Sequence, residues 1–348
     1  MTIPAPYLLY LGHSDDEIGL KTSRGLAAFR GDDCVGEWRH DDCPFTLGLP
    51  RMDAAAARAA GARTVVLGIA NPGGRFPDWM IGDALAAIRA GLNIACGLHE
   101  RLRDVPELVA AAAEAGVTLF DVRDAPETLP VGNGRRRAGK RLLTVGTDCS
   151  VGKMYATLCL RDALRARGLV ADFRATGQTG ILIAGEGVPL DAVVADFIAG
   201  AIETLAPART DEGWDLVEGQ GSLFHPAFAG VSTGLLHGAQ PTALVMCHDP
   251  LRPHMRGLPH FPVPGLAECL DANLRVARLT SPDVRAVGVA LNTVKLDEAA
   301  ARRLCAETED ALGLPCTDPY RFGAEAIIDF LLETPCDASS PFVTTLSR

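Results

Sequence analysis

The chain has 348 residues, of which 48% are hydrophobic and 22% are charged, a composition typical of a globular protein long enough for two domains. Its formal net charge of −10 argues against a nucleic-acid partner or an anionic membrane surface, because both need many Lys and Arg residues. No apolar run is long enough to span a bilayer, and the first residues lack the pattern of a signal peptide, so we expect no membrane partner and a cytoplasmic protein.

The first part of the chain alternates short apolar runs with alanine-rich segments. The runs predict strands at residues 7–11, 64–69, 92–96 and 118–120, and the segments predict helices at 54–60, 79–90 and 105–115. These helices end at Gly61, Gly91 and Gly116, and glycine suits a left-handed helix stop. The alternation predicts a parallel sheet covered by helices, a Rossmann-like domain over residues 1–135.

Two connecting segments of this half have alternative interpretations. The turn from Asn71 to Gly74 follows a strand at its carboxyl end, where it either contacts a ligand or is only a tight turn. Residues 124–140 are typical of a linker, and the basic run Arg135 to Arg137 is either solvated or touches an outer phosphate of a ligand.

The second half repeats the strand and helix alternation. Strands are predicted at residues 141–145, 170–174, 216–218, 243–247 and 287–291, and helices at 191–205, 265–279, 297–312 and 324–332, besides one that starts near residue 153. A second parallel α/β domain over residues 136–348 is therefore expected.

The most informative motif lies near the start of this second domain. It fits the phosphate-binding pattern Gly-x-x-x-x-Gly-Lys and stands between a buried strand and an amphipathic helix. Its residues are Gly146, Thr147, Asp148, Cys149, Ser150, Val151, Gly152 and Lys153. Glycines let the backbone wrap an anion, while the helix N-terminus and the lysine supply donors and charge. The next residue, where a magnesium-binding hydroxyl is common, is Met154, so the motif keeps the phosphate cradle but lacks one standard metal ligand.

A polar loop flanked by glycines follows the strand predicted at 170–174. Such loops at the carboxyl edge of a sheet commonly bind ligands, and a flexible turn is the alternative. We expect four of its side chains to contact the substrate: Arg174, Thr176, Gln178 and Thr179.

Three side chains are candidates for a general acid or base. Glu218 ends a buried strand, where a carboxylate must be paired, metal-bound or protonated; the turn that follows adds Gln220 and Ser222 as substrate contacts. Asp196 lies among apolar residues of the predicted helix 191–205 and is expected to need a partner. His225 is within reach of an acyl or amine group if its loop folds over the site. A capping acid or a packed histidine is the structural alternative.

The later strand ends complete the predicted site. His248, His254 and His260 lie in a proline-rich loop, which we interpret as a mobile lid or a substrate-contact loop rather than a metal cage. Asn292 either contacts a ligand or starts a turn. Because ligands bind at the carboxyl ends of strands in open sheets, one composite site is predicted in the second domain.

These motifs support a family resemblance. The run Gly146 to Lys153, residues 218–221 and Asn292 resemble the dethiobiotin synthetase-like branch of phosphate-loop proteins. More closely, nearly the whole chain resembles a bacterial family long described as of unknown function, whose members have been linked to D-amino-acid metabolism as D-glutamate N-acetyltransferases of the DgcN type. The matching segments are NPGG, ACGLHERL, GTDCSVGKM, FRATGQTGILIAG, DAVVADFIAG and VEGQGSLFHPAFAGVSTGLLHGAQP.

The resemblance implies transfer of the acetyl group of acetyl-CoA to the amino group of D-glutamate or a related D-amino acid. Coenzyme A carries a diphosphate and a 3′-phosphate, so the phosphate loop can hold it without phosphoryl transfer, and Met154 then costs little. Glu218 or His225 is the expected base, with Asp196 a weaker candidate, and Arg174 is expected to pair with a substrate carboxylate. No metal is assigned, and a homodimer is expected.

Two other functions stay open. In the first, the chain binds ATP and Mg²⁺ through Asp148 and Glu218 and activates a carboxylate, as a ligase of the dethiobiotin synthetase type. In the second, it senses a nucleotide or acyl-CoA without catalysis.

Overall fold

The computed structural model describes residues 3–69 and 74–333, which divide into two compact units. Unit 1 contains the chain up to Ala125 together with residues 177–192, and unit 2 contains residues 126–176 and those from Val193 onward. Each unit is built on a parallel sheet with helices, which confirms the predicted fold class. The domain boundary between residues 135 and 136 stays a prediction.

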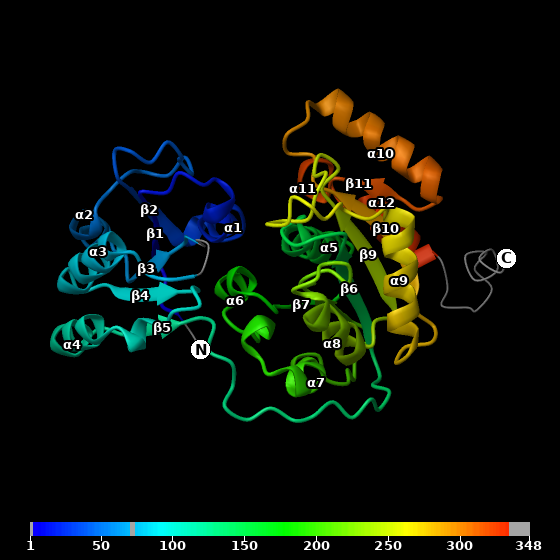
Figure 1. Ribbon diagram of the computed structural model, residues 1–348, viewed down its shortest axis with the longest axis horizontal. Coiled ribbons are helices and arrows are strands. Elements are labelled where there is room, and N and C mark those ends of the chain that lie inside the picture. Colours follow the sequence, from blue (N-terminus) through cyan, green and yellow to red (C-terminus); the bar gives the residue numbers. More distant parts are fainter. Residues whose placement is uncertain (1–2, 70–73, 334–348) are drawn as a thin grey trace. The chain divides into compact units, whose positions relative to one another are not determined.

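Unit 1 has a five-stranded parallel sheet in the order β2-β1-β3-β4-β5. Helices cover both faces (Figure 1), with α1 packed against α6 and α3 packed against α4. Every residue of β1 and β3 is consequently buried, as expected for a sheet covered on both sides. The elements are β1 (Tyr7–Gly12), α1 (Lys21–Phe29), β2 (Cys34–Arg39), α2 (Ala54–Ala59), β3 (Thr64–Leu67), α3 (Asp78–Arg89), β4 (Asn93–Cys96), α4 (Pro106–Ala115), β5 (Leu119–Asp121) and α6 (Gln178–Ala184).

Unit 2 has a six-stranded parallel sheet in the order β11-β10-β9-β6-β8-β7, with β6 near its centre. Its core packs α5 and α12 against the sheet through residues such as Leu142, Leu160 and Ile328. The elements are β6 (Lys140–Gly146), α5 (Lys153–Ala166), β7 (Ala171–Arg174), α7 (Ile198–Leu205), β8 (Trp214–Val217), α8 (Ala229–Ala239), β9 (Ala243–His248), α9 (Leu266–Arg278), β10 (Arg285–Leu291), α10 (Glu298–Leu312), β11 (Cys316–Thr317), α11 (Pro319–Phe322) and α12 (Glu325–Glu333).

The predicted helix stops of unit 1 are confirmed. Gly116 caps α4 with a φ of +67°, and Gly61 and Gly91, which follow the caps of α2 and α3, have φ values of +94° and +78°. The sequence pattern did not predict α1 or the edge strand β2, whose sequence CVGEWR contains no apolar run. Of the turn from Asn71 to Gly74, residues 71–73 lie outside the described residues.

Two predictions in the middle of the chain were wrong in part. The loop expected after β7 ends at Gly177, because Gln178 already begins α6. The helix expected over 191–205 starts only at Ile198, after two short 3₁₀ turns, at Leu190–Ala192 and Ala195–Phe197.

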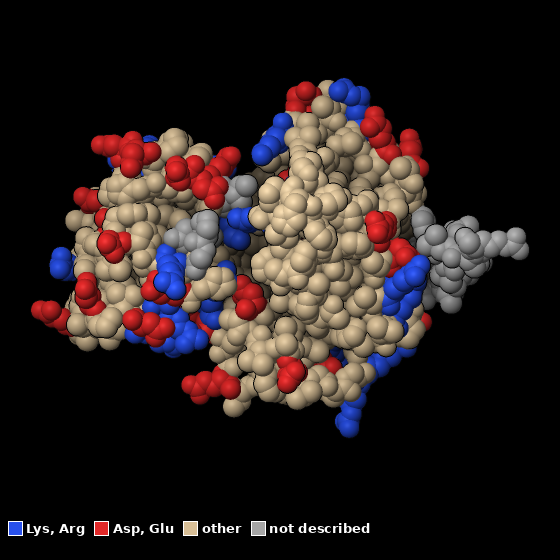
Figure 2. Space-filling model, in the orientation of Figure 1, with Lys and Arg blue, Asp and Glu red and all other residues tan. Residues whose placement is uncertain are grey.

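Charged side chains of both signs are interspersed on the face of the molecule that Figure 2 shows, and no broad basic surface is visible there. Over the described ranges, no helix has the length and apolar character needed to cross a membrane.

Candidate functional site

The predicted phosphate loop lies where β6 passes into α5, at the carboxyl edge of the unit 2 sheet. Gly146 is tightly enclosed, since a Cβ there would lie 2.9 Å from Val151 Cγ2 and 3.1 Å from Lys153 Nζ. Gly152 precedes α5 with a φ of +101°, a conformation that side chains rarely adopt. The order of strand, loop and helix that the motif predicted is confirmed.

Lys153 points back into the loop rather than into solvent. Its side chain is buried, and Nζ donates a hydrogen bond of 2.7 Å to the backbone oxygen of Asp148. Burial lowers the pKa of this ammonium below its usual value. A phosphate bound in the loop would supply the opposite charge that stabilises the protonated lysine.

The loop after β9 contacts the phosphate loop through two arginines that no sequence motif indicated. Arg252 donates from Nη1 to Asp148 Oδ2 at 2.8 Å and to the backbone oxygen of Cys149 at 2.5 Å, and from Nη2 to the backbone oxygen of Ser150 at 3.0 Å. Arg256 donates its backbone N–H to Asp148 Oδ2 at 2.8 Å and its guanidinium to Ser150 Oγ. Ser150 has a φ of +54°, so a residue with a side chain holds a conformation that glycine usually takes.

Asp148 is the charged centre of this contact. Its carboxylate is fully buried, and Oδ1 accepts the Cys149 N–H at 2.6 Å while Oδ2 accepts the two donors from Arg252 and Arg256. A buried carboxylate paired in this way fixes the loop after β9 against the phosphate loop. The arrangement gives Asp148 a structural role and leaves it poorly disposed to bind Mg²⁺.

Glu218 lies directly after β8 and contacts Thr176, the second residue after β7. Its Oε2 accepts the Thr176 N–H at 2.9 Å, and Thr176 Oγ1 donates to the Glu218 backbone oxygen at 2.6 Å. Gln220 joins them by donating from Nε2 to Thr176 Oγ1 at 3.2 Å. Three of the predicted site residues therefore lie together, and Glu218 is buried with only 4% of its surface exposed.

The glycine turn after Glu218 is held against β6. The Gly219 N–H donates to Thr144 Oγ1 at 3.0 Å, and a Cβ at Gly219 would lie 1.9 Å from the Thr144 backbone oxygen. Ser222 donates from Oγ to the backbone oxygen of Thr147 at 3.0 Å. The turn is thus tied to the phosphate loop, as the composite site required.

His225 is buried beside the same loop. Its Nδ1 accepts the Ala227 N–H at 3.2 Å, so Nε2 carries the proton and donates to the Arg256 backbone oxygen at 3.3 Å. One nitrogen of its ring lies within 4.8 Å of both Asp148 and Cys149. Both ring nitrogens are hydrogen-bonded, so His225 can serve as a base only after its contacts with Ala227 and Arg256 are broken.

Two later residues flank the loop from the neighbouring strands. His248, at the end of β9, contacts Thr147 Oγ1 through Nδ1 at 2.9 Å, and burial lowers the pKa of its imidazole. The Asn292 N–H, after β10, donates to the His248 backbone oxygen at 2.8 Å. Asn292 Oδ1 accepts the Val294 N–H at 3.4 Å, as a turn-starting side chain does.

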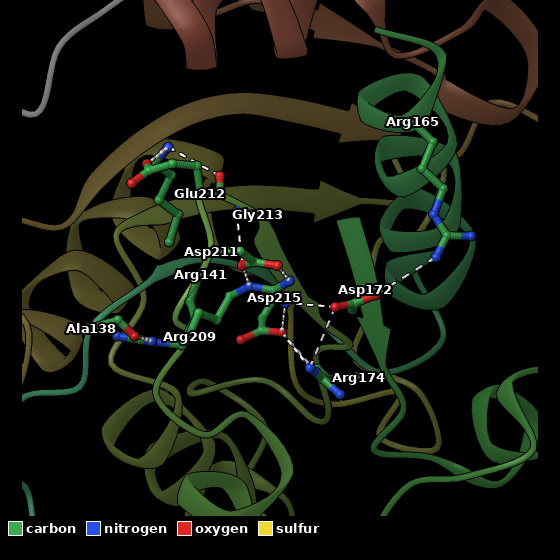
Figure 3. A network of polar contacts seen from close by, with 11 residues as sticks. Ala138, Arg141, Arg165, Asp172, Arg174, Arg209, Asp211, Glu212, Gly213 and Asp215 are labelled. Atoms are coloured by element: carbon green, nitrogen blue, oxygen red, sulfur yellow. Dashed lines mark hydrogen bonds and ion pairs between the residues drawn. The ribbon is translucent and has the colours of Figure 1, made fainter. Parts of the chain in front are cut away.

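Arg174, which was expected to pair with a substrate carboxylate, contacts an aspartate of the protein. At the end of β7 it belongs to a network of acids and arginines (Figure 3) and donates from Nε to Asp215 Oδ1 at 2.8 Å. Arg209 donates from Nη1 to the same oxygen at 2.8 Å and to Asp172 Oδ2 at 2.7 Å. Because Asp215 is fully buried, Arg174 neutralises a carboxylate of the protein itself, and pairing with a substrate would have to compete with that contact.

Two of the remaining predicted residues belong to unit 1, and one is exposed. Gln178 and Thr179 are on α6, within unit 1, where Gln178 Oε1 accepts from Arg123 Nε at 3.2 Å and Thr179 Oγ1 contacts Thr22 Oγ1 at 3.0 Å. The expectation that Asp196 is buried and needs a partner was wrong, because it is exposed on the turn Ala195–Phe197. Met154, in the first turn of α5, is half-buried.

Comparisons with known proteins agree with this architecture. Residues 130–328 match the P-loop domain of a family described as a domain of unknown function, DUF1611, and residues 33–125 match its Rossmann-like domain. A D-glutamate N-acetyltransferase of Tritonibacter scottomollicae is 48% identical over 329 residues, and one of a Pseudoalteromonas species is 45% identical over 328 residues. Each alignment covers 94% of this chain and 99% of the relative.

A solved structure gives the same result. The crystal structure of a DUF1611 family protein from Anabaena variabilis matches with a TM-score of 0.87 at 36% identity, over 95% of this chain and 100% of that one. The family resemblance predicted from the motifs is confirmed.

Proposed function

The chain belongs to the DUF1611 family, and we propose that it is an N-acetyltransferase that acetylates the amino group of D-glutamate. The proposal is supported by two relatives of that name, which are 45–48% identical over almost the whole chain. The substrate is then a small amino acid with two carboxylates and one amine.

We propose acetyl-CoA as the acetyl donor, with its phosphates in the loop from Gly146 to Met154. The observation that carries this is the buried Lys153 ammonium, which faces a backbone oxygen inside a loop shaped for an anion. A coenzyme A phosphate would give this ammonium a charged partner. The reaction needs no metal, so Met154 is compatible with it.

Glu218 is the favoured base. The amine must lose its proton before it attacks the thioester carbonyl; the new C–N bond then forms and the C–S bond breaks. The coenzyme A thiolate leaves and takes up the proton that the base removed. A buried carboxylate at the strand end can accept that proton, and the amides of residues 219–222 are candidates to stabilise the oxyanion. His225 is the second candidate, and Asp196 the weakest because it is exposed.

Within residues 3–69 and 74–333, no contact specifically favours the ligase alternative. It needs Asp148 as a magnesium ligand, and both oxygens of that carboxylate already accept hydrogen bonds from the protein. A homodimer and a cytoplasmic location stay predictions.

The test is release of free thiol from acetyl-CoA with D-glutamate or L-glutamate, beside release of phosphate from ATP and Mg²⁺. The matched variants are Lys153→Ala and Lys140→Ala, because Lys140 begins β6, at the end away from the phosphate loop, and its side chain is 45% exposed. Thiol release that requires D-glutamate and is lost only in Lys153→Ala would support the proposal. Phosphate release that D-glutamate stimulates, without thiol release, would favour the ligase instead.

A further inference from the structure

A second cluster of ligand-type side chains lies in unit 1, at the carboxyl edge of its sheet. His13 directly follows β1, His40 directly follows β2, and Asp83 lies on α3, which comes after β3. In the strand order 2-1-3-4-5, β2 lies on one side of β1 and the later strands lie on the other side, so the order switches between β1 and β3. Ligands of open α/β sheets bind at such a switch point. The three side chains therefore come from separate segments that the topology brings to one place.

The two histidines are held side by side by the backbone. The His40 N–H donates to the Gly12 backbone oxygen at 3.0 Å, which continues the pairing of β1 with β2. Their rings stack with centroids 3.8 Å apart and planes 2° from parallel. The edge of Trp79 packs against His13 at 5.2 Å and gives the pair an apolar wall.

Carboxylates fix the orientation of both rings. His13 Nδ1 lies 2.8 Å from Asp42 Oδ1, which leaves Nε2 as the second ring nitrogen, and His40 Nε2 lies 2.7 Å from Asp83 Oδ2. The Tyr10 hydroxyl also donates to Asp83 Oδ2. The contact of His13 with Asp42 is the usual support of a metal-binding histidine, because it leaves the other ring nitrogen for the ion.

We propose that His13, His40 and Asp83 bind a divalent transition-metal ion, with Asp42 orienting His13. One ligand atom from each of the three lies within 4.8 Å of the others. Rotation of one imidazole out of the parallel stack, with release of the contact between His40 and Asp83, would direct all three toward one ion. Two imidazoles and a carboxylate suit Zn²⁺ and its neighbours, whereas Mg²⁺ and Ca²⁺ prefer oxygen ligands. The side chains of His13, His40 and Asp83 are 34%, 32% and 19% exposed, which gives an ion access from solvent.

The experiment uses the full-length protein after dialysis against a chelator. Co²⁺ is titrated while the near-ultraviolet and visible absorption is recorded, and Zn²⁺ is then added to displace it. We expect one equivalent of Co²⁺ with a visible band and without a thiolate charge-transfer band, because this site contains no cysteine. A site formed by Asp148, Cys149 and His225 in unit 2 would show the thiolate band and would disappear in Cys149→Ser.

The variants His13→Gln and His40→Gln should each lose the bound equivalent of Co²⁺, and Asp42→Asn should weaken Co²⁺ binding by about tenfold. The control is His260→Gln, at an exposed position of unit 2, which should leave Co²⁺ binding unchanged. A rise in the melting temperature of the wild type with Zn²⁺, lost in the two ligand variants, gives a readout independent of colour. Absence of Co²⁺ binding by the wild type, or binding unchanged in His13→Gln and His40→Gln, would overturn the proposal.

Discussion

The carboxyl edges of the two sheets carry comparable sets of polar residues, but these side chains are buried in unit 2 and partly exposed in unit 1. In unit 2, Asp148, Lys153 and Glu218 are 0%, 7% and 4% exposed and satisfied by close contacts. In unit 1, His13 and His40 keep about a third of their side-chain surface in solvent. Removing one partner should therefore damage the folded state far more in unit 2, whereas unit 1 can be tested with little loss of stability.

The largest expected effect is on catalysis at the buried edge. Glu218→Gln keeps the size of the side chain but removes the base, so kcat for thiol release should fall by about 10²–10⁴-fold with a small change in KM. Steady-state kinetics with D-glutamate measure it, and His225→Gln is the comparison. A larger loss of kcat in His225→Gln than in Glu218→Gln would move the base to the histidine.

The next effect concerns stability in unit 2. Arg252→Ala leaves the buried Asp148 carboxylate without its guanidinium, and we expect the free energy of unfolding to fall by about 3–5 kcal/mol. The double variant Asp148→Asn with Arg252→Ala removes the unpaired charge and should recover part of the loss. Urea unfolding of the wild type and of these two variants measures this. Equal stability of Arg252→Ala and wild type would show that the buried pair contributes little.

A smaller effect is a pH dependence that comes from Lys153. Its pKa in the folded state lies below the usual 10.5, so between the two values the unfolded chain binds more protons than the folded one. The free energy of unfolding should therefore rise with pH over that window, and Lys153→Met should lack this contribution. Unfolding midpoints compared at a series of alkaline pH values test it, and parallel pH profiles of the two proteins would contradict it.

The smallest effect is expected at the exposed edge. The side chain of Asp42 is itself 65% exposed, so weakening its contact with His13 in Asp42→Asn should change the stability without metal by less than about 1 kcal/mol. The same unfolding assay measures it beside Arg252→Ala. A loss as large as that of Arg252→Ala would remove the contrast between the two edges.

Local patterns in the sequence predicted the parts of the site that depend on neighbouring residues. The motif ending at Lys153 and the acid Glu218 were found because each follows an apolar strand directly, and parallel strands bring their ends together. β2 was missed because, as an edge strand, it needs no continuous apolar run.

Contacts between segments far apart in the chain could not be predicted from the sequence. Arg252 and Arg256 meet Asp148 across more than a hundred residues, and the proline-rich loop gave no sign of which side chains point inward. Two arginines just after a strand that ends beside the phosphate loop were the only signal. The exposure of Asp196 was mispredicted because a 3₁₀ turn, which does not follow the 3.6-residue period of an α-helix, replaces the expected helix there.

The most direct test of the central claim is equilibrium binding of coenzyme A, without magnesium, to the wild type, Lys153→Met and Lys140→Met. If the phosphate loop holds the coenzyme A phosphates, Lys153→Met should bind at least about 30-fold more weakly, while Lys140→Met should bind like the wild type. Equal affinity in all three proteins, or binding of ATP with Mg²⁺ but not of coenzyme A, would contradict the account.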